Sequence, residues 1–95
     1  MSTETTIDPR GVPRIARGYR LQYENAQAAW VLLYPEGLVK LSETAAEIVQ
    51  RVDGSRSVDA LIAELEGAYP GVDLRGDVIE FLENARGRGW ITIGR

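Results

Sequence analysis

No histidine and no cysteine occur among the 95 residues of this chain. Without histidine, the Ser-His-Asp and Cys-His nucleophile systems and the usual zinc sites are excluded. Without cysteine, the chain has no disulfide and no thiolate ligand, which fits a reducing compartment. Acid–base chemistry would fall to carboxylates, tyrosine or Lys40, the single lysine. We therefore expect a protein that is not an enzyme and has no catalytic residue, no metal and no cofactor of its own.

The chain also lacks a long apolar run and an excess of positive charge. No stretch approaches the roughly 18 apolar residues that suggest a membrane span. The first residues, MSTETTIDPRG, do not have the basic-then-apolar layout of a signal peptide. The formal net charge is −3, so general attraction to nucleic acid is not expected. These features predict a cytoplasmic protein with no membrane or nucleic-acid partner.

Three segments in the first half predict β-strands. Tyr19, Leu21 and Tyr23 alternate with polar residues, which is typical of a half-buried strand. Residues 28–34 form a continuous apolar run of strand length, and residues 38–41 alternate again. We expect these segments to form an antiparallel sheet.

The region before the strands is polar and rich in arginine. Residues 1–12 predict a flexible tail, and residues 13–95 predict one domain. Residues 10–20 contain four arginines. Two interpretations of this segment stay open: a polar, partly extended arm, or a contact surface for an acidic partner.

Three helices are expected after the strands. Ser42 and Ser57 are good N-caps for the first two, and Asp73 is the expected N-cap of the third. Gly54 and Gly89 are expected to end the first and third helices. Each helix has an apolar face at helical spacing. The sequence therefore predicts a small α+β domain, winged-helix-like, with an N-terminal three-stranded antiparallel sheet followed by a three-helix bundle.

The junction between the third strand and the first helix is the expected working part. A strand that runs directly into a capped helix leaves a groove, and a strand edge beside an apolar groove can add an extended peptide. Two alternatives stay open. One is a winged-helix DNA-binding protein. The other is a small carboxylate enzyme or cation site that uses Asp73, Asp77 and Glu80, although solvated carboxylates are common on helix surfaces.

Assembly is the last expectation from the residues themselves. The strand AAWVLLY offers more apolar surface than three short helices cover. Exchange of the N-terminal half between two copies would bury that surface in a two-fold dimer. The residues expected to contribute to this homodimer are Tyr19, Leu21, Tyr23, Trp30 and Leu32.

Four runs give the chain a resemblance to a known family. They are PRIARGYRLQ (13–22), LLYPEGLVKL (32–41), VDG (52–54) and RGW (88–90). Their order and spacing resemble coenzyme PQQ synthesis protein D, the PqqD family, from Pro13 to Ile93. Ser42 stands where the family pattern has Asn, and both residues cap helices well.

The resemblance implies a function that the residues alone only permit. PqqD proteins are peptide chaperones of pyrroloquinoline quinone biosynthesis, the prototype of the recognition element for ribosomally made, modified peptides (RiPPs). They bind the precursor peptide PqqA and present it to the radical SAM enzyme PqqE, which cross-links a Glu and a Tyr of the peptide. Peptide binding is expected at the third strand and first helix. On this chain the expected residues are Leu38, Val39, Lys40, Leu41, Ala45, Ile48, Val49 and Arg51.

Overall fold

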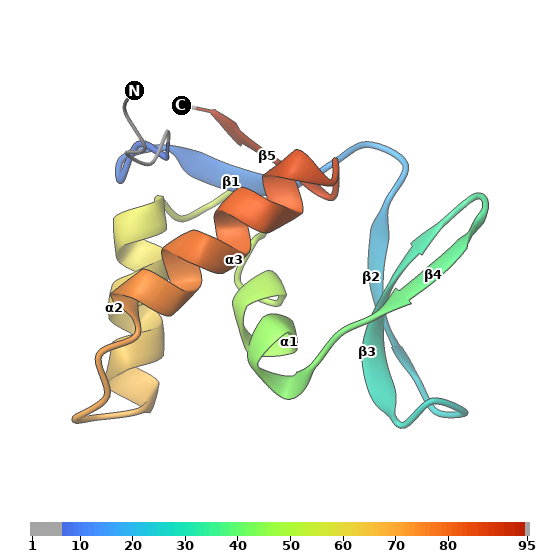
Figure 1. Ribbon diagram of the computed structural model, residues 1–95, viewed down its shortest axis with the longest axis horizontal. Coiled ribbons are helices and arrows are strands. Elements are labelled where there is room, and N and C mark those ends of the chain that lie inside the picture. The colour runs from blue at the N-terminus through green and yellow to red at the C-terminus, as the bar shows by residue number, and fades with distance from the viewer. Residues whose placement is uncertain (1–6, 95) are drawn as a thin grey trace.

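A computed structural model of the chain describes residues 7–94. Along the chain its elements are β1 (Val12–Ile15), β2 (Arg20–Glu24), β3 (Ala29–Tyr34), β4 (Gly37–Lys40), α1 (Glu43–Val49), α2 (Val58–Ala68), α3 (Arg75–Gly87) and β5 (Ile91–Gly94). This is a small α+β domain with antiparallel sheets and three helices, as expected (Figure 1). The winged-helix-like description stays a prediction.

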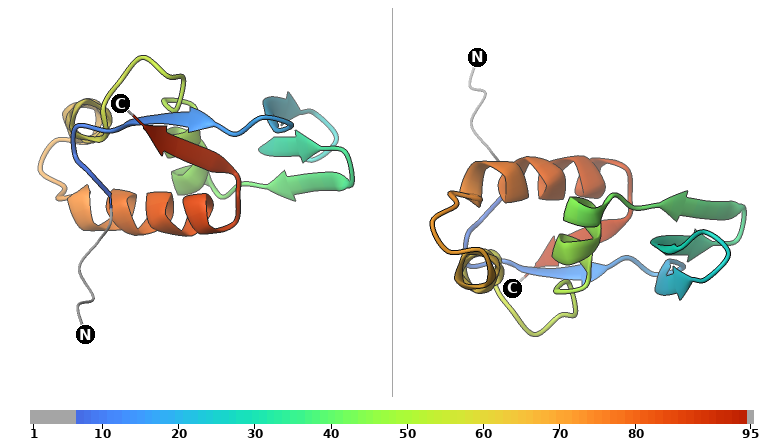
Figure 2. Two further views of the ribbon diagram at one scale, coloured as in Figure 1. Left: turned by 90° about the horizontal axis from the view of Figure 1, so that it is seen from above. Right: turned by 90° about the horizontal axis from the view of Figure 1, so that it is seen from below.

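The strands form two separate sheets. β2, β3 and β4 form the expected three-stranded antiparallel sheet, which projects to one side of the helices (Figure 2). β1 pairs with β5 in a second, two-stranded antiparallel sheet, in which Ile15 lies opposite Ile91. The expected fold was wrong on this point, because the first strand of the chain lies in the segment interpreted as a polar arm. Pro13 and Arg14 obscure its alternation, and its partner lies at the other end of the chain.

The segment before β1 is packed against α2. The carbonyl groups of Pro9 and Gly11 accept hydrogen bonds from the N–H groups of Asp59 and Val58, at 2.9 and 2.8 Å. These two N–H groups belong to the first turn of α2 and have no partner within the helix. Ile7 is buried in the core. The tail predicted over residues 1–12 is therefore wrong for residues 7–12, and its first six residues lie outside the described part of the chain.

Two hydrophobic clusters meet at α1. The larger cluster lies among the three helices and β5, and Ile48 is its contribution from α1. The smaller cluster joins α1 to the inner face of the three-stranded sheet, where Val49 packs with Leu32. The seven-residue helix α1 therefore directs apolar side chains both toward the other helices and toward the three-stranded sheet. Within residues 7–94, no helix is long and apolar enough to cross a membrane.

Two of the three expected helix caps are confirmed. The Ser42 and Ser57 hydroxyls accept hydrogen bonds from the N–H groups of Ala45 and Ala60, each at 3.1 Å. The third cap is a correction: α3 begins at Arg75, and its N-cap residue is Leu74, which makes no side-chain cap. Asp73 stands one position too early, and its carboxylate accepts from the Arg75 N–H at 3.3 Å instead.

Gly54 connects α1 to α2 in a conformation that favours glycine. Its φ is +81°, and a Cβ atom there would lie 3.2 Å from Nε of Arg14. We expect Gly54→Ala to lower the free energy of unfolding by about 1–2 kcal/mol, since left-handed backbone is costly for alanine. Urea denaturation followed by circular dichroism measures this.

Gly67→Ala is the matched control for that substitution. Gly67 lies in α2, and a Cβ atom there meets nothing within 4 Å. Alanine should raise the stability by about 0.5–1 kcal/mol at such a position. Equal effects of the two substitutions would contradict the role assigned to Gly54.

Candidate functional site

The outer edge of β4 presents unpaired backbone groups. β4 pairs with β3 alone in the described sheet, with Val39 opposite Leu32 and Lys40 opposite Val31. The Leu41 N–H donates to the Trp30 carbonyl at 2.9 Å, which fixes the alternation along the strand. By that alternation the backbone groups of Val39 face β3, and those of Leu38 and Lys40 point outward. The edge can therefore accept a further strand.

The expected site residues divide into an exposed set and a buried set. On β4, the Leu38 side chain is 41% exposed, Lys40 is exposed and Val39 is half-buried. From Leu41 onward the apolar residues are buried: Ile48 is 2% and Val49 1% exposed, and Leu41 and Ala45 are also in the core. These side chains pack into the core at the junction between β4 and α1, and Leu41 and Ile48 also line a groove there. Their assignment to peptide binding stays a prediction.

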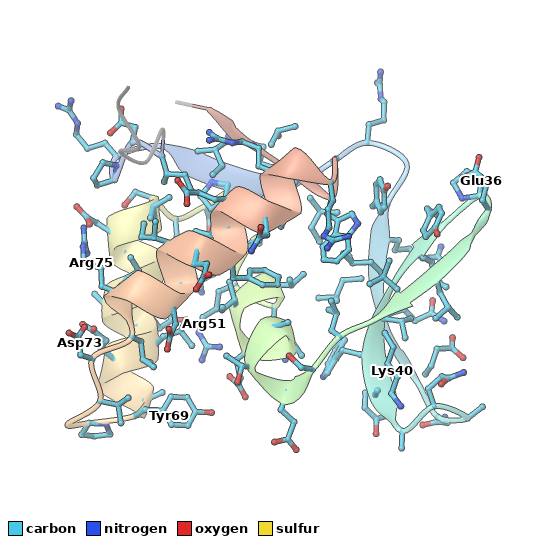
Figure 3. The ribbon with its side chains drawn as sticks, in the orientation of Figure 1. Glu36, Lys40, Arg51, Tyr69, Asp73 and Arg75 are labelled. Carbon is cyan, nitrogen blue, oxygen red and sulfur yellow. The ribbon has the colours of Figure 1, made fainter. Side chains whose placement is uncertain are left out.

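Arg51 holds α1 to α2. Its guanidinium donates to Glu47 at 2.9 Å and to Glu64 at 2.8 Å, and also to the Glu47 carbonyl (Figure 3). Burial disfavours the charged form of Arg51, but the hydrogen bonds and charges of Glu47 and Glu64 outweigh it, so the pKa of Arg51 is raised. The sequence predicted the Glu47 pair by its spacing. Glu64 is a second carboxylate partner of the same guanidinium. Arg51 therefore forms two ion pairs within the chain when no peptide is bound.

α3 has little positive charge to offer to a phosphate backbone. Arg75 is the only arginine in its first two turns, and it pairs with Asp59 at 2.6 Å. That hydrogen bond raises the pKa of Arg75 and keeps its charge directed at α2. Asp77 and Glu80 are exposed on the same helix. These charges disfavour the open alternative of a DNA recognition helix.

Carboxylates do not converge on a cation site in the described chain. Across residues 7–94, no group of three or more His, Cys, Asp or Glu side chains lies close enough to hold a metal ion. The Asp73 carboxylate instead bonds the Arg75 N–H at the start of α3.

A groove of about 680 Å³ lies around α1 and reaches its junction with β4, where Leu41 and Ser42 line it. One end is bounded by Tyr23 and Trp30, whose rings meet edge to face with centroids 5.5 Å apart. The other end is bounded by Tyr69 and Val72, in the connection from α2 to α3. Figure 3 shows Tyr69 at the end of α2, with its ring directed toward α1. Leu41, Ala46, Ile48, Leu65 and Val78 are the buried apolar residues along the groove.

The sequence predicted a groove at the junction of the third strand and the first helix, and Leu41 and Ile48 line this one, but it did not predict the two ends of the groove. Tyr69 falls in the apolar stripe of the second helix, which predicts a core position, but it is 44% exposed. Val72 and Tyr23 are 51% and 47% exposed, and neither was distinguished as a surface residue from its pattern alone. Three separate parts of the chain form the groove, so a pattern within one segment does not reveal its full extent. One feature of the sequence could have indicated that Val72 is exposed: it lies in the turn between Pro70 and the third helix.

Comparisons with known proteins agree with this fold. The family model for coenzyme PQQ synthesis protein D (PqqD) matches residues 29–91. The chain is 49% identical over 92 residues to a PqqA binding protein of Azotobacter vinelandii, covering 96% of this chain and 98% of that protein. It is 52% identical over 89 residues to a PqqA binding protein of Pseudomonas fluorescens, covering 93% and 98%.

A solved structure has the same fold. It is the solution NMR structure of the PqqD truncation of Methylobacterium extorquens PqqCD, described as a functional, stand-alone RiPP recognition element. The TM-score is 0.75 at 26% identity, and the match covers 93% of this chain and 96% of that one. The matches extend over nearly the whole length of the relatives, and the family model covers more than half of this chain. The chain therefore belongs to the PqqD family.

Proposed function

We propose that this chain is a peptide chaperone of pyrroloquinoline quinone biosynthesis, which binds the precursor peptide PqqA and presents it to the radical SAM enzyme PqqE. Near-complete coverage of relatives described as PqqA binding proteins is the observation that carries the proposal. In this role the chain binds and positions a peptide, and PqqE performs the chemistry. The absence of histidine and cysteine agrees with a role that requires no catalytic group.

Strand addition at β4 is the binding mode that we propose. An extended peptide beside β4 can bond the outward N–H and C=O groups of Leu38 and Lys40, which sets its register. The exposed Leu38 side chain offers an apolar contact to the peptide. Val39 and the buried residues Leu41, Ala45 and Val49 support the strand from behind. Ile48 anchors α1 in the larger cluster, and Arg51 fixes α1 against α2. Free backbone groups at a strand edge bind main chain of any sequence, so side chains along the strand supply specificity.

Two further expectations belong to this proposal. The homodimer formed by exchange of the N-terminal half stays a prediction, as does action in the cytoplasm. In the described single chain, Leu32 is already buried against α1, and Tyr19 stacks on Tyr34 with ring centroids 5.3 Å apart. A swapped dimer would form these same contacts between two copies, so the free-energy difference from the monomer would be small.

Titration of the fluorescently labelled chain with synthetic PqqA tests the proposal. We expect saturable one-to-one binding, and formation of a ternary complex when PqqE is added. A scrambled peptide of the same composition is the control and should bind at least about tenfold more weakly, as loss of matched side-chain contacts costs about 1.4 kcal/mol or more. Equal binding of PqqA and the scrambled peptide would contradict a specific PqqA chaperone.

A further inference from the structure

The groove around α1 gathers most of the exposed large apolar side chains of the described chain. Four large hydrophobic residues are exposed: Tyr23, Leu38, Tyr69 and Val72. All but Leu38 line the groove, and Leu38 lies on β4. A groove with exposed apolar side chains at both ends and polar groups along its rim is typical of a protein interaction site.

The charges around the groove have one sign. Glu43, Glu47 and Asp77 line it, and no Lys or Arg is among the described residues that do. Glu47 pairs with Arg51, but Glu43 and Asp77 have no ion-pair partner within residues 7–94. Such a rim is complementary to a segment that carries Lys or Arg beside apolar side chains.

The walls of the groove are held in place by contacts inside the chain. The Glu66 carboxylate accepts a hydrogen bond from the Leu74 N–H at 3.0 Å, and the Val72 N–H donates to the Tyr69 carbonyl at 3.3 Å. These bonds fix the connection between α2 and α3 that carries Tyr69 and Val72. On the opposite side, the edge-to-face pair of Tyr23 and Trp30 fixes the other wall. A preformed groove costs less ordering on binding than a loop that must first fold.

We propose that this groove is the docking surface for the peptide-modifying enzyme, through a segment in which apolar side chains are flanked by Lys or Arg. The proposal rests on the function proposed above, in which PqqA adds to the edge of β4. No residue of β4 lines the groove, but Leu41 and Ser42, which directly follow β4, do, so the outer edge of β4 and the groove are adjacent surfaces. A chaperone that presents a peptide must contact peptide and enzyme at the same time, and two adjacent surfaces permit that.

Binding of PqqE and of PqqA to matched variants tests this assignment. The full chain carrying both Tyr69→Ser and Val72→Ser should bind PqqE at least about tenfold more weakly, because aromatic anchors dominate interface energetics. Its affinity for PqqA should stay within about twofold of the parent, as β4 is untouched. Leu38→Ser is the matched control, since it also removes an exposed apolar side chain. It should show the opposite pattern, with weaker PqqA binding and unchanged PqqE binding.

Charge supplies a second, independent readout. Asp77→Lys should weaken PqqE binding, and the salt dependence of the remaining binding should be shallower than that of the parent. Asp77 is exposed, and circular dichroism verifies that the variant is folded. The assignment is overturned if the Tyr69, Val72 double variant binds PqqE as tightly as the parent, or if it loses PqqA affinity as much as PqqE affinity. A parent chain that does not bind PqqE at all would instead overturn the proposed presentation of the peptide, and the assignment with it.

Discussion

Ile48→Asp is expected to remove a large part of the stability of the protein. Ile48 is 2% exposed and packs with α2, α3 and β5 in the larger hydrophobic cluster. A carboxylate at this position would be charged without a partner or would be protonated at a cost, and packing would be lost as well. We expect a loss of about 4 kcal/mol or more, against a total stability of roughly 5–15 kcal/mol for a small domain. Urea denaturation and near-ultraviolet circular dichroism measure the loss.

Thr44→Asp is the matched control for Ile48→Asp. It places the same carboxylate on the same helix, but Thr44 is exposed and lies in the first turn, where negative charge is favoured. Its stability should stay within about 0.5 kcal/mol of the parent. If Ile48→Asp is as stable as the parent and only fails to bind PqqA, Ile48 is a surface contact for the peptide, and its placement in the core is wrong.

Lys40→Pro is expected to weaken PqqA binding by about tenfold or more. The Lys40 N–H points away from β3, so its loss breaks no bond of the sheet, and proline is tolerated at such an edge. A peptide strand beside β4 would lose one backbone hydrogen bond, which contributes about 1 kcal/mol, and would meet the proline ring. Titration with PqqA measures the loss, and thermal unfolding verifies the fold.

Lys40→Ala separates the backbone from the side chain. It removes the ammonium group but keeps the N–H, so PqqA affinity should stay within about threefold of the parent if backbone pairing dominates. Strand addition at this edge would be refuted by a folded Lys40→Pro protein that binds PqqA like the parent. A larger loss for Lys40→Ala than for Lys40→Pro would assign the effect to the charge of Lys40.

Local patterns predicted most of the elements. The caps at Ser42 and Ser57 and the positive φ of Gly54 follow from short-range hydrogen bonding and backbone sterics, which neighbouring residues determine. The prediction that Gly54 ends the first helix was wrong, because α1 already ends at Val49 with Gln50 as its C-cap. The three strands of the larger sheet were found for the same reason, because alternation is visible within one segment. β1 was missed because its four residues include Pro13 and Arg14 and its pairing depends on β5 at the far end of the chain.

The site was harder to predict than the fold. Apolar spacing identified the buried face of α1, but spacing does not say whether that face meets the core of the same chain or a ligand. Ile48 and Val49 prove to be buried by their own chain. Tyr69 and Val72 show the reverse: they are apolar but exposed, since α1 and the connection after α2 leave a groove between them. Whether an apolar residue is buried or exposed here depends on how the elements pack together. The periodicity of a single segment carries no information on that packing.

Amide hydrogen exchange along β4, measured by NMR with and without saturating PqqA, tests the central claim most directly. The outward N–H groups of Leu38 and Lys40 should exchange rapidly in the free chain and slow by about tenfold or more when PqqA pairs with them. The Val39 N–H faces β3 and should change much less. Strong protection of Leu38 and Lys40 with little change at Val39 is the predicted result. Unchanged exchange at Leu38 and Lys40 in the saturated complex would contradict strand addition at β4.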